Sequence, residues 1–492
     1  MPPALISPSL PPLPESKLPS SVLHRTLHTD PQKVTSAKGL YLTLANGQRI
    51  LDATGGAAVS CLGHGDERVK AAVMDQMDKV AYCHSLFYGT DAVEELAREL
   101  VETTGGEMGR AFFVSSGEFF FGVLLLWEEE RGWGSEAMEA AMKMARQYFL
   151  EVSPAESKRV NFIARKESYH GTTLGSLSVG GHRSRRALFE PMLLQNVSRV
   201  SPCNAYRFMK DGESVEQYVA RLAEELDQEF QRLGPETVCA FVAEPVVGAA
   251  LGCVPSVPGY FAAMRDVCRK HGALLIMDEV MSGCGRTGTI HAWQAPEIGF
   301  APDIQTLGKA LGGGHVPVAA MLVNKRVVDT LQKGTGAFSH GQTYQGHPVA
   351  CRAALETLRI IKEENLVENV ATVGRYMGQL LEERVGILPY VGNIRGKGFF
   401  WGIEFVKDKT TKQAFPPKLG IAMGVHELGL QEPYNVSIYP GTGTVDGREG
   451  DHVLLAPPYT ASKEDVEMIV DLTARVIKEH FDVMEQNNKL LP

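Results

Sequence analysis

Short, continuous apolar runs alternate with stretches of helical periodicity through the middle of the chain. Strands that alternate with helices are typical of βα units and a mostly parallel sheet. Parallel strands are buried on both faces, so they are apolar throughout, as these runs are. The pattern therefore predicts an α/β fold around a mostly parallel central sheet. The runs are AFFV (111–114), NFIA (161–164), VCAFVA (238–243), ALLIM (273–277) and VAAMLV (318–323).

The two ends of the chain have different patterns. Residues 39–53 (GLYLTLANGQRILDA) predict two short strands around the turn Asn46-Gly47. Helical periodicity follows from about residue 65, in the segments 69–80 and 92–104. From about residue 350 we expect long helices, then a strand region in GKGFFWGIEFV (396–406), then a last helix over about 462–480. This C-terminal pattern predicts a second, smaller α+β domain.

The length of 492 residues also indicates more than one domain. We expect residues 23–70 to be the N-terminal segment of the small domain, residues 71–335 to form the large domain, and residues 336–492 to form the C-terminal small domain. Residues 1–22 are rich in Pro and Ser and predict a disordered tail. The tail lacks the apolar core of a secretory signal and the Arg-rich character of a mitochondrial leader, so we expect a cytoplasmic protein.

The composition excludes several classes of protein. Hydrophobic residues make up 44% and charged residues 22%, as in soluble globular enzymes. The net charge of −9 argues against a nucleic-acid partner, and no apolar run is long enough to span a bilayer. Eight scattered cysteines without a C-x-x-C pair predict reduced thiols, and we expect no metal site.

Polar residues follow the apolar runs directly. Ser115-Ser116-Gly117 follows the first run, Glu244-Pro245 the third, and Asp278-Glu279 the fourth. Ligands of open α/β sheets bind beyond the carboxyl ends of the strands, so these residues should converge on one site. A carboxylate at Asp278 is largely desolvated and needs a partner. That partner is either a protonated pyridine nitrogen of a cofactor, or a helix end or arginine in a purely structural role.

Lys309 lies among glycines, in TLGKALGGG (306–314). Glycines allow close backbone approach and unusual dihedral angles around the amine. A lysine that forms a Schiff base needs a fixed position and a lowered pKa, whereas an ordinary loop lysine needs neither. The run lacks the G-x-x-x-x-G-K-[ST] spacing of a nucleotide-binding loop.

The segments LLIMDEVMSGCGRTG (274–288), Ala292-Trp293 and APDIQTLGKALGGG (301–314) resemble the signature of class III aminotransferases. These are pyridoxal-5′-phosphate (PLP) enzymes of fold type I. The resemblance extends from LDATGGAAVSCLGHG (51–65) to GDHVLLAPPY (450–459). It implies a PLP-dependent transferase of fold type I, with a mostly parallel central sheet and a smaller α+β domain.

The resemblance assigns roles around the cofactor ring. Lys309 would form the Schiff base and then move the proton between the amino-acid carbon and the cofactor. Asp278 would pair with the pyridinium nitrogen. Val280 would pack against one face of the ring, and Tyr169 would stack on the other. Glu244 would lie near the phenolic oxygen of the cofactor or the substrate amine.

The resemblance also assigns the phosphate contacts. Ser116 and Gly117 would bind the phosphate at a helix N-terminus. Thr343 would bind it from the neighbouring subunit, which implies a homodimer with two shared sites. His170, His347 and Arg286 match structural positions of the family motifs rather than catalytic ones.

One segment departs from the family pattern. After Gly117 the sequence EFFFGVLLLWEEERGWG (118–134) intervenes before the helix that begins at Ser135-Glu136-Ala137. Removal of these residues restores the pattern. The segment is either a true insertion or a stretch of unspliced or mis-predicted sequence, and it separates the phosphate loop from its helix.

The resemblance implies ping-pong transamination, from an amine or ω-amino acid to a 2-keto acid. Two alternatives remain at this point. The same scaffold carries decarboxylases and mutases that use PLP, and a catalytically silent relative could act as a binding protein.

Overall fold

The computed structural model describes residues 20–115, 134–487 and 489. Ser116 and Gly117, predicted to bind phosphate, lie outside the described residues. So do residues 118–133 of the atypical segment and residues 1–19 of the predicted tail.

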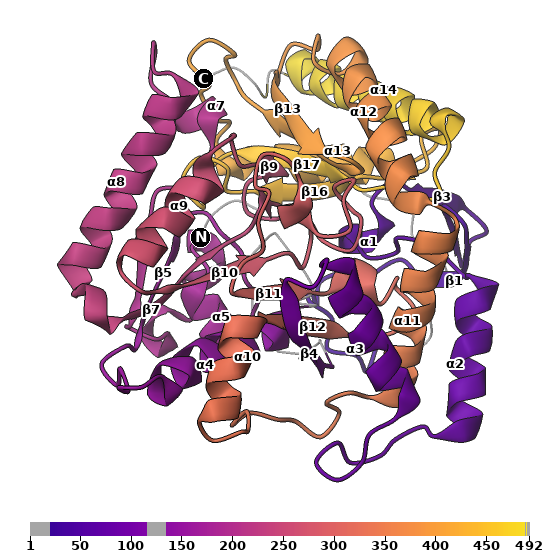
Figure 1. Cartoon of the computed structure of the whole chain (residues 1–492). Helices are drawn as coiled ribbons and strands as arrows, with labels where there is room; N and C mark the ends of the chain where they lie inside the picture. The colour runs from indigo at the N-terminus through magenta and orange to yellow at the C-terminus, as the bar shows by residue number, and fades with distance from the viewer. Residues whose placement is uncertain (1–19, 116–133, 488, 490–492) are drawn as a thin grey trace.

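A seven-stranded sheet forms the centre of the fold within the described residues (Figure 1). In sheet order its strands are β4 (Met108–Val114), β12 (Ala319–Asn324), β11 (Ile304–Leu307), β10 (Leu274–Asp278), β7 (Val238–Ala243), β5 (Asn161–Arg165) and β6 (Val197–Val200). The five strands from β11 to β6 are parallel, whereas β12 is antiparallel to both of its neighbours. All five predicted apolar runs form strands of this sheet, which confirms the α/β fold.

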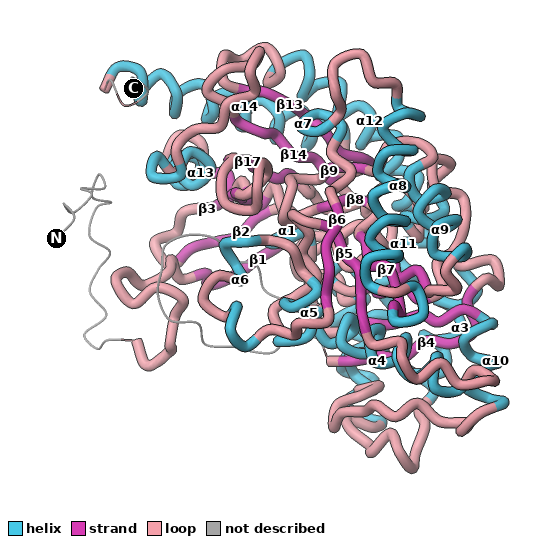
Figure 2. The backbone as a smooth tube through the Cα atoms, turned by 90° about the vertical axis from the view of Figure 1, so that its left-hand side faces the viewer, coloured by secondary structure: helices cyan, strands magenta, loops and turns pink. Residues whose placement is uncertain are grey.

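Helices cover both faces of this sheet, as the apolar runs require (Figures 1 and 2). Successive side chains of β7 alternate between the faces. Ala240 and Val242 pack with α4 (Ser135–Glu151). Phe241 and Ala243 pack with α8 (Val215–Leu233) and α9 (Tyr260–Lys270) on the other face. The strands are thus buried on both sides, and polar residues are favoured only where the strands end.

The C-terminal part contains a second, antiparallel sheet. Its strands in order are β13 (Val391–Lys397), β14 (Phe400–Phe405), β17 (Asp451–Leu455) and β16 (Tyr439–Thr442). Helices α12 (Leu366–Arg384) and α14 (Lys463–Gln486) lie together beside it, in orange and yellow at the top of Figure 1. The predicted last helix is confirmed as α14, and GKGFFWGIEFV contributes to β13 and β14.

The N-terminal strands are connected to the C-terminal part. They are β1 (Val34–Lys38), β2 (Tyr41–Leu44) and β3 (Arg49–Asp52), and the last two form the predicted hairpin around Asn46-Gly47. Strand β3 also pairs with β15 (Val436–Ser437). The two ends of the chain therefore share one sheet, while the boundaries at residues 70 and 335 stay predictions.

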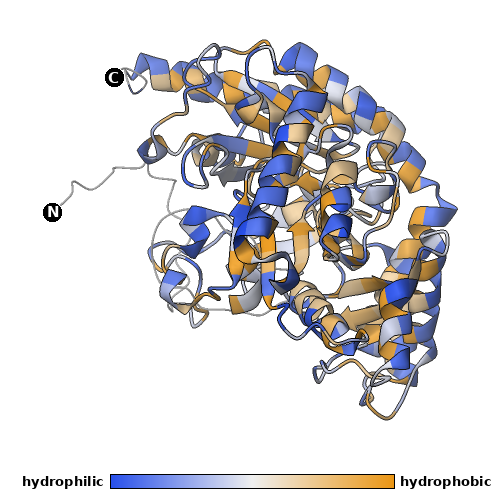
Figure 3. Cartoon of the chain, turned by 60° about the vertical axis from the view of Figure 1, so that its left-hand side comes forward, coloured by the Kyte–Doolittle hydropathy of each residue, from blue (hydrophilic) through white to orange (hydrophobic). Residues whose placement is uncertain are grey.

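The helices that face solvent have blue, hydrophilic outer surfaces, and the strands between them are largely orange (Figure 3). Within the described residues, no helix combines the length and the apolar character that a membrane span requires.

The remaining helices are α1 (Gly55–Ala58), α2 (Glu67–Lys79), α3 (Asp91–Thr103), α5 (Leu174–Val179), α6 (Arg183–Arg186), α7 (Ala205–Phe208), α10 (Lys325–Lys333), α11 (Pro348–Glu363) and α13 (Ile421–Gly429), and the remaining strands are β8 (Val246–Val247) and β9 (Val254–Pro255).

Candidate active site

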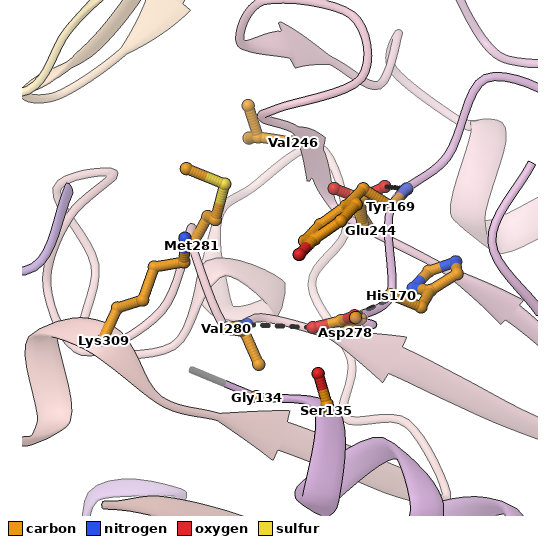
Figure 4. Close-up of a pocket in the computed structure, with 11 residues that line it drawn as sticks. Gly134, Ser135, Tyr169, His170, Glu244, Val246, Asp278, Val280, Met281 and Lys309 are labelled. Atoms are coloured by element: carbon orange, nitrogen blue, oxygen red, sulfur yellow. Dashed lines mark hydrogen bonds and ion pairs between the residues drawn. The ribbon is translucent and has the colours of Figure 1, made fainter. Parts of the chain in front are cut away.

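A pocket lies at the carboxyl ends of the central strands (Figure 4). Asp278 ends β10, Glu244 follows β7, and Lys309 comes two residues after β11. Glu244 and Asp278 therefore converge, as the sequence predicted. Ser115 does not line this pocket, and Ser116 and Gly117 lie outside the described residues. The pocket is lined by Gly134, Ser135, Tyr169, His170, Gly171, Glu244, Val246, Asp278, Val280, Met281 and Lys309.

Lys309 has an unusual backbone conformation. It begins the short turn Lys309–Leu311 with φ +45°, in the left-handed region, and only 1% of its surface is exposed. A non-glycine residue in this region is strained, and such strain persists only where the surroundings impose it. Figure 4 shows the aliphatic chain running from the backbone into the pocket. The fold therefore holds one buried amine at a fixed position in this wall.

Asp278 is held on both of its carboxylate oxygens. Oδ1 accepts hydrogen bonds from the backbone N–H of Val280 and from Oγ1 of Thr306, each at 3.1 Å. Oδ2 lies 2.8 Å from Nδ1 of His170. These contacts satisfy part of the carboxylate's bonding capacity and fix its direction. A charge this deeply buried still favours a cationic partner in the pocket.

Glu244 is fixed by two backbone N–H groups. Oε1 accepts from Tyr169 at 3.0 Å, and Oε2 accepts from Gly248 at 3.3 Å. Burial raises the pKa of Glu244 to about 7, and the nearby charge of Asp278 also raises it. The carboxyl group can therefore hold or release a proton near neutral pH.

The walls between these polar groups are aromatic and aliphatic. The ring of Tyr169 points into the pocket (Figure 4). Val280 lies beside Gly134, so closely that a Cβ on this glycine would come within 2.4 Å of the valine methyl group. A side chain at position 134 would therefore close this end of the pocket.

Helix α4 begins at the pocket. Its N-cap is Gly134, which offers no side-chain cap, and Gly134 and Ser135 both line the pocket. The N-terminal N–H groups of a 17-residue helix favour an anion such as a phosphate. Ser135 Oγ accepts a hydrogen bond from the N–H of Thr172 at 2.9 Å, which ties this end of the helix to the loop after Gly171.

These groups fit the expected cofactor. A buried lysine amine, a fixed carboxylate, an aromatic ring and a helix N-terminus surround one pocket, and PLP offers an aldehyde, a pyridine nitrogen, a ring face and a phosphate to match them. Five of the predicted residues meet here: Lys309, Asp278, Tyr169, Glu244 and Val280.

Thr343 does not line the pocket. It is exposed, in the loop before α11. A role in phosphate binding would require a second subunit, as the family resemblance implies. The sequence did not indicate that Ser135 and Met281 line the pocket, or that Thr306 contacts Asp278. It gave His170 only a structural place, whereas the structure puts its ring nitrogen on the Asp278 carboxylate.

Comparisons with known proteins agree with this geometry. The model of the family "Aminotransferase class-III" matches residues 24–119 and 131–477. An aminotransferase of Gibberella zeae is 54% identical, over 91% of this chain and 84% of the relative. Gamma aminobutyrate transaminase 3 of Solanum lycopersicum is 33% identical, over 93% of this chain and 82% of the relative.

A solved structure of a transaminase also resembles this chain over most of its length. An amine transaminase from an uncultivated Pseudomonas species, in its PLP-bound form, has a TM-score of 0.83 and 30% identity, and the match covers 94% of this chain and 99% of the other.

Proposed function

This chain belongs to the class-III aminotransferases, and from that premise we propose which role each of its own residues has in a PLP-dependent transamination. PLP, when bound, supplies an electron sink that stabilises negative charge on the substrate carbon. Lys309 would hold the cofactor covalently through its Nζ. Its buried, fixed position supports this assignment. Its Nζ would also hold and move the proton at the substrate carbon.

Asp278 would hold the proton on the pyridine nitrogen of the cofactor. Its burial and its three hydrogen-bond contacts, from Val280, Thr306 and His170, support this role because they fix the direction of the charge. Tyr169 and Val280, which both line the pocket, would contact the cofactor ring. Gly134 and Ser135, at the start of α4, would bind the phosphate, together with Ser116 and Gly117 as the family resemblance implies.

We also propose a homodimer in which Thr343 reaches the phosphate of the neighbouring subunit. An exposed apolar surface supports this proposal. Leu86, Phe87 and Tyr88 are 75%, 70% and 67% exposed, in the loop between α2 and α3. Tyr82 of the same loop packs against Tyr344, which neighbours Thr343, with ring centroids 5.6 Å apart. Exposed apolar groups in one surface are typical of protein interfaces.

The substrates we propose are an amine or ω-amino acid as donor and a 2-keto acid as acceptor, in a ping-pong sequence. The relatives named for amines and for gamma aminobutyrate support this choice. No observation on the described residues favours decarboxylation, mutase chemistry or a silent binding role. A cytoplasmic location stays a prediction.

The experiment is a panel of amine donors, tested with pyruvate and with 2-oxoglutarate as acceptors. The purified holoenzyme should be yellow and should transfer amino groups from at least one donor to one of these acids. A colourless protein that remains inactive after incubation with PLP would overturn the proposal.

A further inference from the structure

A short hairpin (residues 246–255) connects the pocket to the C-terminal sheet. It consists of β8 and β9, which pair at Val246 with Pro255 and at Val247 with Val254. The hairpin begins two residues after Glu244, and Val246 lines the pocket (Figure 4). Strand β9 lies beside β13 of the antiparallel sheet (Figures 1 and 2). The hairpin is therefore a direct link between the pocket and a sheet whose described residues do not line it.

The turn of this hairpin (residues 248–253) holds one of the pocket carboxylates. The N–H of Gly248 donates to Oε2 of Glu244 at 3.3 Å. The carbonyl oxygen of Gly248 accepts from the N–H groups of Gly252 and Cys253, at 2.7 and 3.2 Å. Cys253 has φ +56°, in the left-handed region, a conformation that persists only where the surroundings impose it. The place of the Gly248 N–H therefore depends on the shape of the whole turn.

Arg395 of β13 holds the end of this turn. Its Nε donates to the carbonyl oxygen of Gly252 at 2.9 Å, and its Nη2 donates to the carbonyl oxygen of Leu251. One planar guanidinium group thus binds two adjacent carbonyl oxygens, which the single ammonium group of a lysine cannot reproduce. The turn also lies close to β14, because a Cβ on Gly402 would come within 2.1 Å of the carbonyl oxygen of Gly252. The turn is therefore fixed against β13 and β14.

The charge of Arg395 is balanced by a fully buried carboxylate. Glu404 of β14 forms ion pairs with Arg395 and with Arg207 of α7. Oγ1 of Thr444 also donates to Glu404, at 2.9 Å. A buried ion pair persists only where further hydrogen bonds satisfy both partners, as they do here. The guanidinium group of Arg395 therefore has a fixed place between Glu404 and the hairpin turn.

We propose that Arg395 is a positioning residue of the active site. By holding the hairpin turn, it sets the place of the Gly248 N–H and, through that group, the direction of the Glu244 carboxylate in the pocket. The consequence for transamination rests on the proposed function, whereas the effect on Glu244 does not.

The hydrogen bond from Gly248 also influences the proton of Glu244. A donor to a carboxylate favours the ionised form, so the loss of this hydrogen bond would raise the pKa of Glu244 further. The other groups that act on this carboxyl group all lie outside the hairpin: the N–H of Tyr169 and the charges of His170, Asp278 and Arg165. A change at Arg395 should therefore reach Glu244 through the hairpin.

The test compares two variants of Arg395 with a matched control. Arg395→Lys keeps a positive charge beside Glu404 but cannot hold both carbonyl oxygens, and Arg395→Gln removes the charge as well. The control is Arg159→Gln. Arg159 is also buried, and its Nη1 donates to the carbonyl oxygens of Pro235 and Val238 at 3.1 and 2.6 Å, at the beginning of β7 rather than at its pocket end.

Hydrogen–deuterium exchange of the apoprotein measures the hairpin itself. In Arg395→Lys, the amides of residues 246–254 should exchange at least about 10-fold faster than in the wild type, as expected for the loss of one hydrogen bond from a charged donor. Arg395→Gln should exchange at least as fast, and Arg159→Gln should leave the exchange of these amides unchanged. Wild-type exchange of the hairpin in both Arg395 variants would overturn the inference.

The pH profile of Glu244 separates positioning from a general loss of stability. Each apoprotein is melted beside the same protein with Glu244→Gln added, between about pH 5 and about pH 9. The stability that protonated Glu244 contributes is lost as the pH rises through its folded-state pKa, so a higher pKa extends this loss to higher pH. Arg395→Lys should move the upper end of the dependence by about one pH unit, and Arg159→Gln should not move it. A lower melting temperature in Arg395→Lys without this shift would mean a structural role only.

Steady-state kinetics of the holoenzymes test the consequence for the reaction. With the most active donor and acceptor, kcat should fall about 10-fold in Arg395→Lys and stay within about twofold in Arg159→Gln. An unchanged kcat in a variant whose hairpin exchanges faster would overturn the role in the active site. If the wild-type enzyme transaminates no pair of substrates, the proposed function fails, while exchange and the pH profile still decide whether Arg395 positions Glu244.

Discussion

Nδ1 of His170 lies 2.8 Å from Oδ2 of Asp278, across 108 residues of sequence. The other carboxylate oxygen is held by Thr306 and by the backbone of Val280. Asp278 cannot turn away from the pocket without breaking these contacts. The direction of its charge is therefore set by the fold before a cofactor binds, which is how preorganised electrostatics assist catalysis.

Asp278→Asn should preserve the fold and slow the chemistry. The neutral amide cannot keep the pyridine nitrogen protonated, so the electron sink weakens. We expect proton abstraction in a single-turnover half-reaction to slow by roughly 100-fold or more. Thr306→Val is the graded comparison: it removes one hydrogen bond but keeps the charge, and should slow the step only about 2- to 10-fold. An unchanged half-reaction rate in Asp278→Asn would contradict the assigned role.

Lys309→Ala should abolish turnover and the yellow colour of the bound cofactor. The variant loses both the covalent attachment and the base, and the base alone is worth roughly 10²–10⁴-fold. The exposed Lys333, at the end of α10, gives the control variant Lys333→Ala, which should behave as the wild type. The measurements are steady-state activity and the visible absorbance spectrum. Near-normal activity in Lys309→Ala would disprove the assignment.

The raised pKa of Glu244 predicts that the stability of the folded protein depends on pH. Burial raises its pKa from 4.5 to about 7 in the folded protein. Between these values the folded state keeps a proton that the unfolded state has lost, so its contribution to stability is full below about pH 4.5 and is lost as the pH rises toward 7. The upper bound of this loss is about 3 kcal/mol.

Glu244→Gln removes this titration. The melting temperature of the variant apoprotein, relative to the wild type, should therefore increase between about pH 5 and about pH 8. Other raised carboxyls, such as Glu279, titrate in both proteins and cancel in the difference. The exposed Glu236 gives the control Glu236→Gln. A difference in melting temperature that does not vary with pH would count against a neutral Glu244.

The sequence predicted the central sheet well because its buried strands are continuous apolar runs. It missed β6 (VSRV) and β11 (IQTL), because polar residues interrupt both. Asp278 and Glu244 were singled out from their places after strands, Lys309 from the glycines around it, and all three from the family motif. The contact between His170 and Asp278 could not be predicted, because nothing local in the sequence indicates which distant residue faces a carboxylate.

The proposed dimer predicts the effect of a charge at its surface. Phe87→Asp should dissociate the dimer and weaken PLP binding, because a buried, unpaired charge is unfavourable and Thr343 would no longer reach the partner's phosphate. Ile387→Asp is the matched control. Ile387 is 73% exposed and Phe87 is 70% exposed, but Ile387 is far from the loop between α2 and α3 in the sequence. Analytical ultracentrifugation and a PLP titration give the two measurements. A wild-type monomer that binds PLP tightly would contradict the dimer.

The effect of the segment 118–134 on the protein can be tested by its deletion. The family model stops at residue 119 and resumes at residue 131. Deletion of 118–134 would join Gly117 directly to Ser135. A glycine would then still precede α4, where Val280 leaves no room for a side chain. The loop amides and the helix N-terminus, which together favour a phosphate, would become adjacent in sequence.

We therefore expect the deletion variant to bind PLP more tightly and to melt at a higher temperature than the full chain. The segment also contains Phe119, Phe120, Phe121 and Trp127. Any of these Phe side chains that stayed in water would forgo roughly 1.5–3 kcal/mol of burial free energy, which would favour aggregation of the full chain. A PLP titration and a thermal melt at equal protein concentration compare the two proteins. If the full chain binds PLP as tightly and melts as high as the deletion variant, the segment is an insertion that the fold accommodates.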